Sequence, residues 1–155
     1  MTRPPPRHDG MKGWRCLLAG VLVSGTAVAA AGDADYVGKP LLALVSYPNL
    51  PSLLRQASGG QQSAMARAVR YDGPGLELTA GRYLNSYACS PEGCAEDGVF
   101  LAYDTEDGRI YLMLVREGSM VIQVPPRRAP WPDVLAPRVA AFGAAPENLT
   151  YAPPP

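Results

Sequence analysis

Three apolar runs in the second half of the chain, separated only by short polar turns, constrain the fold more than any other feature. The runs cover residues 99–103, 110–115 and 120–124, and the connections between them are residues 104–108 and 116–119. Connections this short cannot form the crossover that parallel neighbours need, so the three strands are predicted to be antiparallel. Because the runs are apolar almost throughout, both faces of their sheet must be covered, and the flanking helices are the expected cover. The predicted fold class is α+β: an antiparallel sheet with short helices packed on it.

Short helices are predicted on both sides of these strands in the sequence. A first helix is expected over 40–45, because Pro40 is tolerated in a first helical turn. The helix expected over 61–70 has the better amphipathic pattern. A last helix is expected over 131–142, broken near Pro137. In the second of these helices the predicted buried residues are Ala64, Met65, Ala68 and Val69.

Two more strands are predicted between the helices and the apolar runs. Residues 76–79 read as a weak strand, and residues 82–89 as a stronger, half-buried one. In the stronger strand, Tyr83 and Tyr87 alternate onto one face and Leu84 onto the other. This strand leads directly into the next feature of the sequence.

The six-residue segment from Cys89 to Cys94, Cys-Ser-Pro-Glu-Gly-Cys, combines residues that restrict the backbone with the composition of an exposed turn. Pro91 fixes one backbone angle and Gly93 permits a left-handed one, which describes a tight ring rather than a helix. If the two cysteines are oxidised, the ring presents Glu92 at its tip. Closing so small a loop stabilises a fold by only about 2 kcal/mol, so a rigid tip for insertion into a cleft is an equally reasonable purpose. The alternative is a ring that only staples the end of a hairpin, with Glu92 solvated.

Residues 1–31 are predicted to be an N-terminal extension and a secretory signal peptide. Met11 is a credible start, Lys12 and Arg15 supply positive charge, and residues 16–31 are uncharged, apolar and end in alanines. An uncleaved membrane anchor is the alternative, but the run is short for a span of about 20 residues. The predicted location is therefore the periplasm, with no membrane attachment after cleavage.

Removal of this leader narrows the functions that the protein can have. Cys16 is lost, and Cys89 and Cys94 remain as an even pair in an exported protein, which is the usual context for a disulfide. His8 is the only histidine of the chain and is lost as well. A mature chain without histidine cannot run Ser-His-Asp or Cys-His catalysis and lacks the commonest metal ligand.

The remaining chain is long enough for one domain with one core. We predict a single domain over 32–143 and a flexible C-terminal tail over 144–155. Its net charge becomes −3, with Arg127-Arg128 as the only basic pair, so nucleic acid is not an expected partner.

Acidic residues elsewhere do not form a convincing catalytic or metal site. Asp104, Glu106 and Asp107 resemble a calcium loop, but counting back from Gly108 as the sixth position puts Tyr103 at the first ligand. This segment is predicted to be a hairpin turn. Paired carboxylates could run glycoside hydrolysis, but nothing in the sequence places two of them across a cleft. We predict a protein that is not an enzyme and that uses no metal and no cofactor.

The segment from Arg82 to Cys94, followed by an apolar strand, an acidic turn and a second strand, resembles the family of inhibitors of vertebrate lysozyme, Ivy. The resemblance is clear from about Tyr83 to Val115. It implies a periplasmic protein with helices packed on an antiparallel sheet and a disulfide-closed Cys-Lys-Pro-His-Asp-Cys ring. Cys89, Pro91 and Cys94 fall on that pattern. Glu92 stands where the family has the histidine that enters the lysozyme cleft, and Gly93 replaces the acidic residue after it.

The resemblance predicts a proteinaceous inhibitor of lysozyme or a related peptidoglycan hydrolase, which plugs the cleft with the Cys89–Cys94 loop. The different-class alternative, favoured by Glu92, is a periplasmic binding or structural module that keeps the scaffold and does not inhibit lysozyme. Some members of the family dimerise, so a homodimer is an alternative to the monomer. The predicted partner-binding residues are Ser90, Pro91, Glu92 and Gly93.

Overall fold

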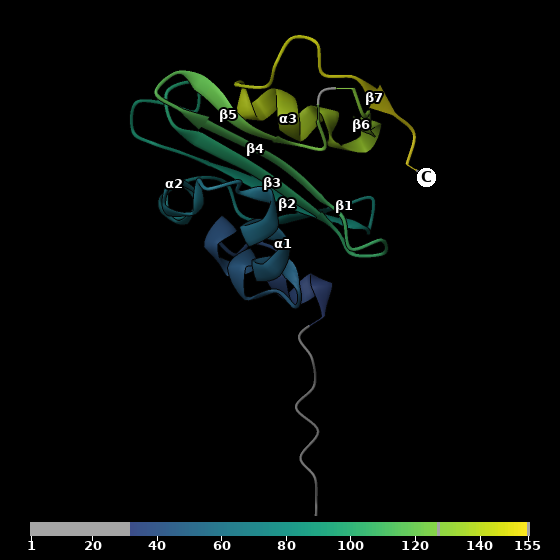
Figure 1. The fold of residues 1–155 in the computed structure, drawn as a ribbon. Helices are drawn as coiled ribbons and strands as arrows, with labels where there is room; N and C mark the ends of the chain where they lie inside the picture. The colour runs from purple at the N-terminus through teal and green to yellow at the C-terminus, as the bar shows by residue number, and fades with distance from the viewer. Residues whose placement is uncertain (1–31, 127, 155) are drawn as a thin grey trace, which may run out of the picture. The chain divides into compact units, whose positions relative to one another are not determined.

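A computed structural model describes residues 32–126 and 128–154, so the predicted leader lies outside the described residues. Its centre is a five-stranded antiparallel sheet with the strands in sequence order, as Figure 1 shows. This confirms the predicted fold class and the antiparallel pairing of the three apolar runs. The strands are β1 (Glu77–Thr79), β2 (Tyr83–Cys89), β3 (Gly98–Asp104), β4 (Ile110–Arg116) and β5 (Ser119–Val124).

Both faces of this sheet are buried, as the apolar runs predict. All seven residues of the central strand β3 are buried, which a strand with one solvated face would not show. Leu101 pairs with Leu112 of β4 and belongs to the core on one face, whereas Phe100 pairs with Met113 and belongs to the core on the other. The predicted alternation in β2 is also confirmed, since Tyr83 and Leu84 fall in different cores, but the prediction that this strand is half-buried is wrong, because residues on both of its faces are buried.

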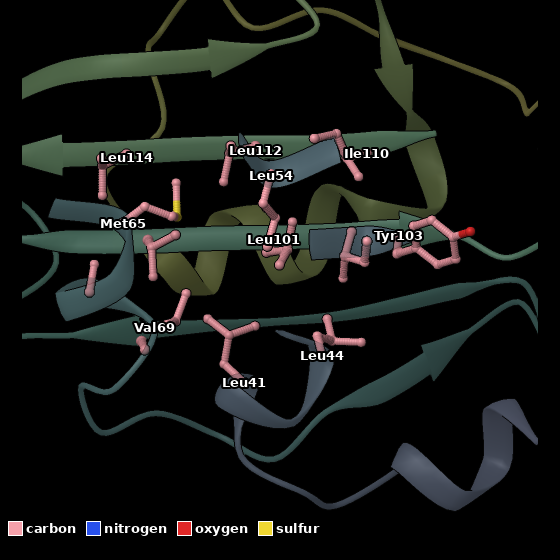
Figure 2. Packing of buried hydrophobic residues seen from close by; sticks show 14 of the residues in the cluster. Leu41, Leu44, Leu54, Met65, Val69, Leu101, Tyr103, Ile110, Leu112 and Leu114 are labelled. Carbon is pink, nitrogen blue, oxygen red and sulfur yellow. The ribbon is translucent and has the colours of Figure 1, made fainter. Parts of the chain in front are cut away.

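The first face is covered by the N-terminal helices (Figure 1). Their buried side chains, including Leu44, Leu54 and Met65, meet those of β3 and β4 in one cluster (Figure 2). These helices are the 3₁₀ helices η1 (Asp33–Tyr36) and η2 (Leu41–Ser46) and the α-helices α1 (Leu50–Ala57) and α2 (Gln62–Ala68).

Two of these four elements were predicted, and two, η1 and α1, were missed. The helix expected over 40–45 is η2, with Pro40 at its N-cap, and the helix expected over 61–70 is α2. All four of the residues predicted to be buried in α2 are buried. Helix α1 was not predicted, although its buried residues Leu50 and Leu54 are four apart and therefore share one face.

The second face is covered by the C-terminal part of the chain (Figure 1). Here the single helix predicted over 131–142 is wrong. Trp131–Pro132 form a short strand, β6, followed by the 3₁₀ helix η3 (Asp133–Leu135) and helix α3 (Ala136–Phe142). Pro137 lies in the first turn of α3, where its missing N–H costs no helical hydrogen bond, so it begins the helix instead of breaking it.

Part of the segment predicted as a flexible tail, 144–155, has regular structure. Tyr151–Ala152 form strand β7, which pairs in parallel with β6. The Trp131 N–H donates to the Thr150 carbonyl at 2.9 Å, and Leu149 packs on the core of the second face. Within the described residues, no helix has both the length and the apolar character to cross a membrane.

Candidate functional site

The connection between β2 and β3 is a compact loop closed by the Cys89–Cys94 disulfide, and the two Cα atoms lie 4.5 Å apart. We call residues 89–97 the ring loop. The structure therefore has the disulfide that the cysteine count allows and the family resemblance implies. It places this loop at the end of the sheet where β2 stops and β3 begins.

Backbone hydrogen bonds inside the ring loop fix its conformation. The Ser90 N–H donates to the Asp97 carbonyl at 2.8 Å, and the Gly93 N–H donates to the Ser90 carbonyl at 2.9 Å. The Asp97 N–H in turn donates to the Gly93 carbonyl at 3.1 Å. Gly93 has a φ of 112°, a conformation that other residues rarely adopt. Three hydrogen bonds and a covalent link therefore leave the loop little freedom.

The four residues predicted to bind a partner are not equally accessible. Pro91 and Glu92 are exposed, Gly93 is partly exposed, and Ser90 is buried. The Ser90 hydroxyl has no hydrogen-bond partner among the described residues. Of these four residues, Pro91 and Glu92 are therefore the pair that lies on the surface, and Ser90 lies inside the loop.

Two other loops meet the ring loop at this end of the sheet. The Cys89 N–H donates to the Asp72 carbonyl at 2.9 Å, which connects the ring loop to residues 71–75. The Gly118 N–H donates to the Glu96 carbonyl at 3.0 Å, which connects it to the turn between β4 and β5. We call this group of three loops the ring end of the sheet.

The ring end carries an excess of negative charge. Only Glu117 has a cationic partner within the described residues: Arg116, whose Nη2 lies 3.3 Å from Glu117 Oε1. Unpaired carboxylates at one end of a molecule attract a positively charged partner from a distance. The five acidic residues of the ring end are Asp72, Glu92, Glu96, Asp97 and Glu117.

Comparison with known protein families decides what scaffold carries this loop. The model of one family, described as inhibitor of vertebrate lysozyme (Ivy), matches residues 51–146, more than half of the chain. The chain belongs to the Ivy family. Ivy proteins are inhibitors and not enzymes, so membership gives lysozyme inhibition as the general function and lysozyme as the partner. No curated protein and no solved structure matches the chain.

The Ivy match is wider than the stretch from Tyr83 to Val115 on which the resemblance rests. It begins in α1 and extends beyond α3, so it includes α2, α3 and nearly all of α1, but not η1 and η2 of the N-terminal layer. Within the ring loop the Ivy pattern holds at Cys89, Pro91 and Cys94. Ser90, Glu92 and Gly93 depart from it, and of these three only Glu92 is exposed.

Sequence reasoning missed Asp72 and Glu117 as members of this site. Their signal was present in the topology: in an antiparallel sheet, the turn after β4 lies at the same end as the connection before β3. Residues 71–75 join that end through a bridge between Asp72 and Cys89. This bridge depends on tertiary pairing and has no local sequence pattern.

The acidic turn after β3 is organised differently from the ring loop. Asp104 accepts hydrogen bonds from Arg82 Nε at 2.8 Å and from Arg82 Nη2 at 2.7 Å, and Asp107 and Glu106 pair with the same guanidinium. Burial alone would raise the pKa of the Asp104 carboxyl, but the hydrogen bonds from Arg82 and from two backbone N–H groups outweigh it and lower that pKa. The segment is a hairpin turn, as predicted. In the part of the chain that the structure describes, no group of three or more acidic, cysteine or histidine side chains could hold a metal.

Proposed function

We propose that this Ivy-family chain inhibits a lysozyme, or a related peptidoglycan hydrolase, by inserting the tip Pro91–Glu92 into the active-site cleft. The observation that carries the proposal is the exposed tip on a loop whose backbone is already fixed. A rigid loop loses little conformational entropy on binding, so more of the contact energy appears as affinity. Ser90 and Gly93 act from within the loop by holding the tip in place.

The negative charge of the ring end supports a cationic partner. Charge complementarity between two surfaces raises the association rate and excludes partners of the wrong sign. Four of the five carboxylates at the ring end have no ion pair among the described residues, so their negative charge is not compensated within the fold. This negative charge would attract a cationic cell-wall hydrolase before any specific contact forms.

Glu92 makes the inhibition dependent on pH. The cleft of lysozyme contains two carboxyl groups, one of them ionised. An ionised Glu92 about 4 Å from that carboxylate would be repelled by roughly 4 kcal/mol at an effective dielectric of 20. This corresponds to about three decades in affinity. A proton shared between the two carboxyl groups removes the repulsion, so inhibition strengthens as the pH falls.

A second function, from a different class, is a binding or structural module that keeps the Ivy scaffold without inhibiting lysozyme. Glu92 is the observation that favours it, because the residue at the tip carries the wrong charge for a cleft of carboxylates at neutral pH. The two functions differ in what the tip does. Only the inhibitor needs Pro91–Glu92 to reach its target.

The proposal places the protein in the periplasm, after removal of a leader that ends near residue 31. Amino-terminal sequencing of the exported protein tests this directly, and a chain that keeps residues 16–31 would contradict it. Sedimentation of the same material distinguishes the monomer from the predicted alternative, a homodimer.

The deciding experiment measures inhibition of a C-type lysozyme by the purified protein at pH 5 and at pH 8. The expected result is stronger inhibition by the wild type at pH 5 than at pH 8, loss of the inhibition at pH 5 in Glu92→Ala, and equal or better inhibition by Glu92→His. Glu147→Ala is the matched control, since Glu147 is an exposed glutamate outside the ring end, and it should inhibit like the wild type.

Each alternative outcome has a distinct meaning. Equal inhibition by the wild type at the two pH values would remove the role given to the Glu92 charge. If Glu92→His inhibits lysozyme and the wild type does not, the scaffold is that of an inhibitor whose natural target is another protein. Full inhibition by a variant that lacks the tip would show that the ring loop is not the plug.

A further inference from the structure

An apolar groove lies in the layer of N-terminal helices, among η2, α1 and α2. It has a volume of about 270 Å³. Its apolar lining comes from all three helices and includes Leu42, Val45, Leu54, Met65, Ala66 and Val69. None of these residues belongs to the ring end, so the groove is a separate feature of the molecule.

The floor and the walls of the groove differ in exposure. Leu54, Met65 and Val69 form the floor and are buried, and the same side chains pack toward the sheet in Figure 2. Leu42 and Val45, by contrast, are 39% and 36% exposed. Large apolar side chains exposed beside a hollow are a feature of ligand-binding grooves. Methionine in the floor adds a flexible, polarisable surface that adapts to an apolar guest.

The polar lining of the groove includes two cations and no acid. Arg55 and Arg70 are exposed lining residues. Arg55 Nη2 donates to Ser52 Oγ at 3.0 Å, and Arg70 Nε donates to the Ala66 carbonyl at 3.2 Å. Within the described residues neither guanidinium has a carboxylate partner, and no Asp or Glu lines the groove. The charge that complements this lining is therefore negative.

We propose that the groove binds a single-chain anionic amphiphile, with a fatty acid as the ligand class. The alkyl chain lies against Leu42, Val45 and Met65, and the carboxylate pairs with the rim arginines. Charge complementarity selects the anionic head, and the apolar lining selects the chain. A stable protein interface buries at least about 1,000 Å², which is more than a hollow between helices of eight and seven residues offers.

Calorimetric titration of the whole protein with octanoate, decanoate and dodecanoate tests the proposal. Each methylene contributes about 0.8 kcal/mol when buried, so affinity should rise about fourfold per methylene until the groove is filled. Neutral 1-decanol should bind about tenfold more weakly than decanoate, because it lacks a charge-assisted bond to arginine. Absence of saturable binding of decanoate, or equal affinity for decanoate and decanol, would overturn the proposal.

Three variants locate the binding. Ala66→Trp fills the groove from an exposed helical position and should abolish decanoate binding. The double variant Arg55→Gln, Arg70→Gln should lower the affinity for decanoate to that for decanol. Arg67→Gln is the matched control, because Arg67 is an exposed arginine of α2 that does not line the groove, and it should bind decanoate normally.

The same variants separate this proposal from the proposed function and from self-association. Ala66→Trp should inhibit lysozyme like the wild type, since the groove and the ring loop share no residue. Retention of decanoate binding by Ala66→Trp would place the ligand elsewhere and overturn the proposal. A wild-type dimer that becomes a monomer on Ala66→Trp would also overturn it, since the occupant would then be a second copy of the chain.

Discussion

The two ends of the sheet carry acidic turns of similar composition but opposite organisation. At one end, Arg82 pairs with Asp104, Asp107 and Glu106 at 2.7, 2.7 and 3.1 Å, so each of the three carboxylates has a cationic partner within the fold. At the ring end, five carboxylates accompany one guanidinium, that of Arg116. The same residue types therefore serve stability at one end and attraction of a partner at the other. What distinguishes the two is how many of the acids are paired with a cation: all three at the Arg82 end and only Glu117 at the ring end.

Burial explains why the two arrangements cannot be exchanged. The Asp104 side chain is fully buried, whereas Glu92 and Glu96 are exposed. A buried carboxylate without a partner costs several kcal/mol, so Asp104 requires Arg82. An exposed carboxylate keeps its hydration and needs no partner. Exposed acids are therefore free to face another molecule, and this comparison can be tested from both ends.

The largest expected effect is on stability at the Arg82 end. Asp104→Asn should lower the free energy of unfolding by about 3 kcal/mol, because it removes one member of a buried ion pair whose arginine is partly exposed. Urea unfolding at pH 7 measures this change. Asp97→Asn at the ring end is the matched control and should change stability by less than about 0.5 kcal/mol. Equal losses from the two substitutions would show that burial and pairing with Arg82 give Asp104 no special role in stability.

The Asp104 effect should also depend on pH with a definite sign. The pKa of Asp104 in the folded chain lies below its ordinary value of 3.8. Its ion pair therefore stabilises the fold fully above that value, and this contribution is lost as the pH falls through the folded pKa. The difference in stability between the wild type and Asp104→Asn should be constant near neutral pH and should shrink below about pH 4. A difference that grows on acidification would contradict the sign.

A smaller effect on stability is expected from the disulfide at the ring end. The double variant Cys89→Ser, Cys94→Ser should lose about 2 kcal/mol, because the closed loop is short and the chain-entropy gain is correspondingly limited. Its loss of lysozyme inhibition should exceed what this destabilisation explains, since the protein remains folded while the tip becomes mobile. Thermal unfolding and inhibition measured on the same samples separate the two. Unchanged inhibition would show that a rigid tip is not required.

The smallest effect in free energy is expected from the acidic residues around the tip. Replacing Asp72, Glu96, Asp97 and Glu117 by their amides should slow association with a cationic lysozyme about tenfold at low salt, with little change in the dissociation rate. The difference should diminish as the salt concentration rises, because exposed charges are screened. Stopped-flow association kinetics measure both effects. If the association rate does not change, the acidic residues have no role in attracting the partner and contribute only to solubility.

Much of the sheet could be predicted because the features that specify it lie within short stretches of the sequence. The short turns after residues 104 and 116 require antiparallel neighbours, and continuous apolar strands require cover on both faces. The ring could also be predicted, since cysteine spacing, a proline and a glycine define it together. Helix α1 was missed, because two leucines four residues apart in a short segment give a weak periodic signal. The helix predicted over 131–142 was wrong because a proline inside a pattern has the same appearance whether it breaks a helix or begins one.

Local sequence patterns were enough to specify the order and direction of the central strands, the position of the ring and the exposure of Glu92. Only the tertiary structure brought Asp72 and Glu117 to the ring loop, paired β7 with β6 and formed the groove among three helices. The physical reason is the range of the interactions. Turn length, alternation and ring closure act within a few residues, whereas these later features depend on backbone and side-chain contacts between segments far apart in the chain. Such contacts are known only from the folded structure, in which tertiary packing brings these segments together.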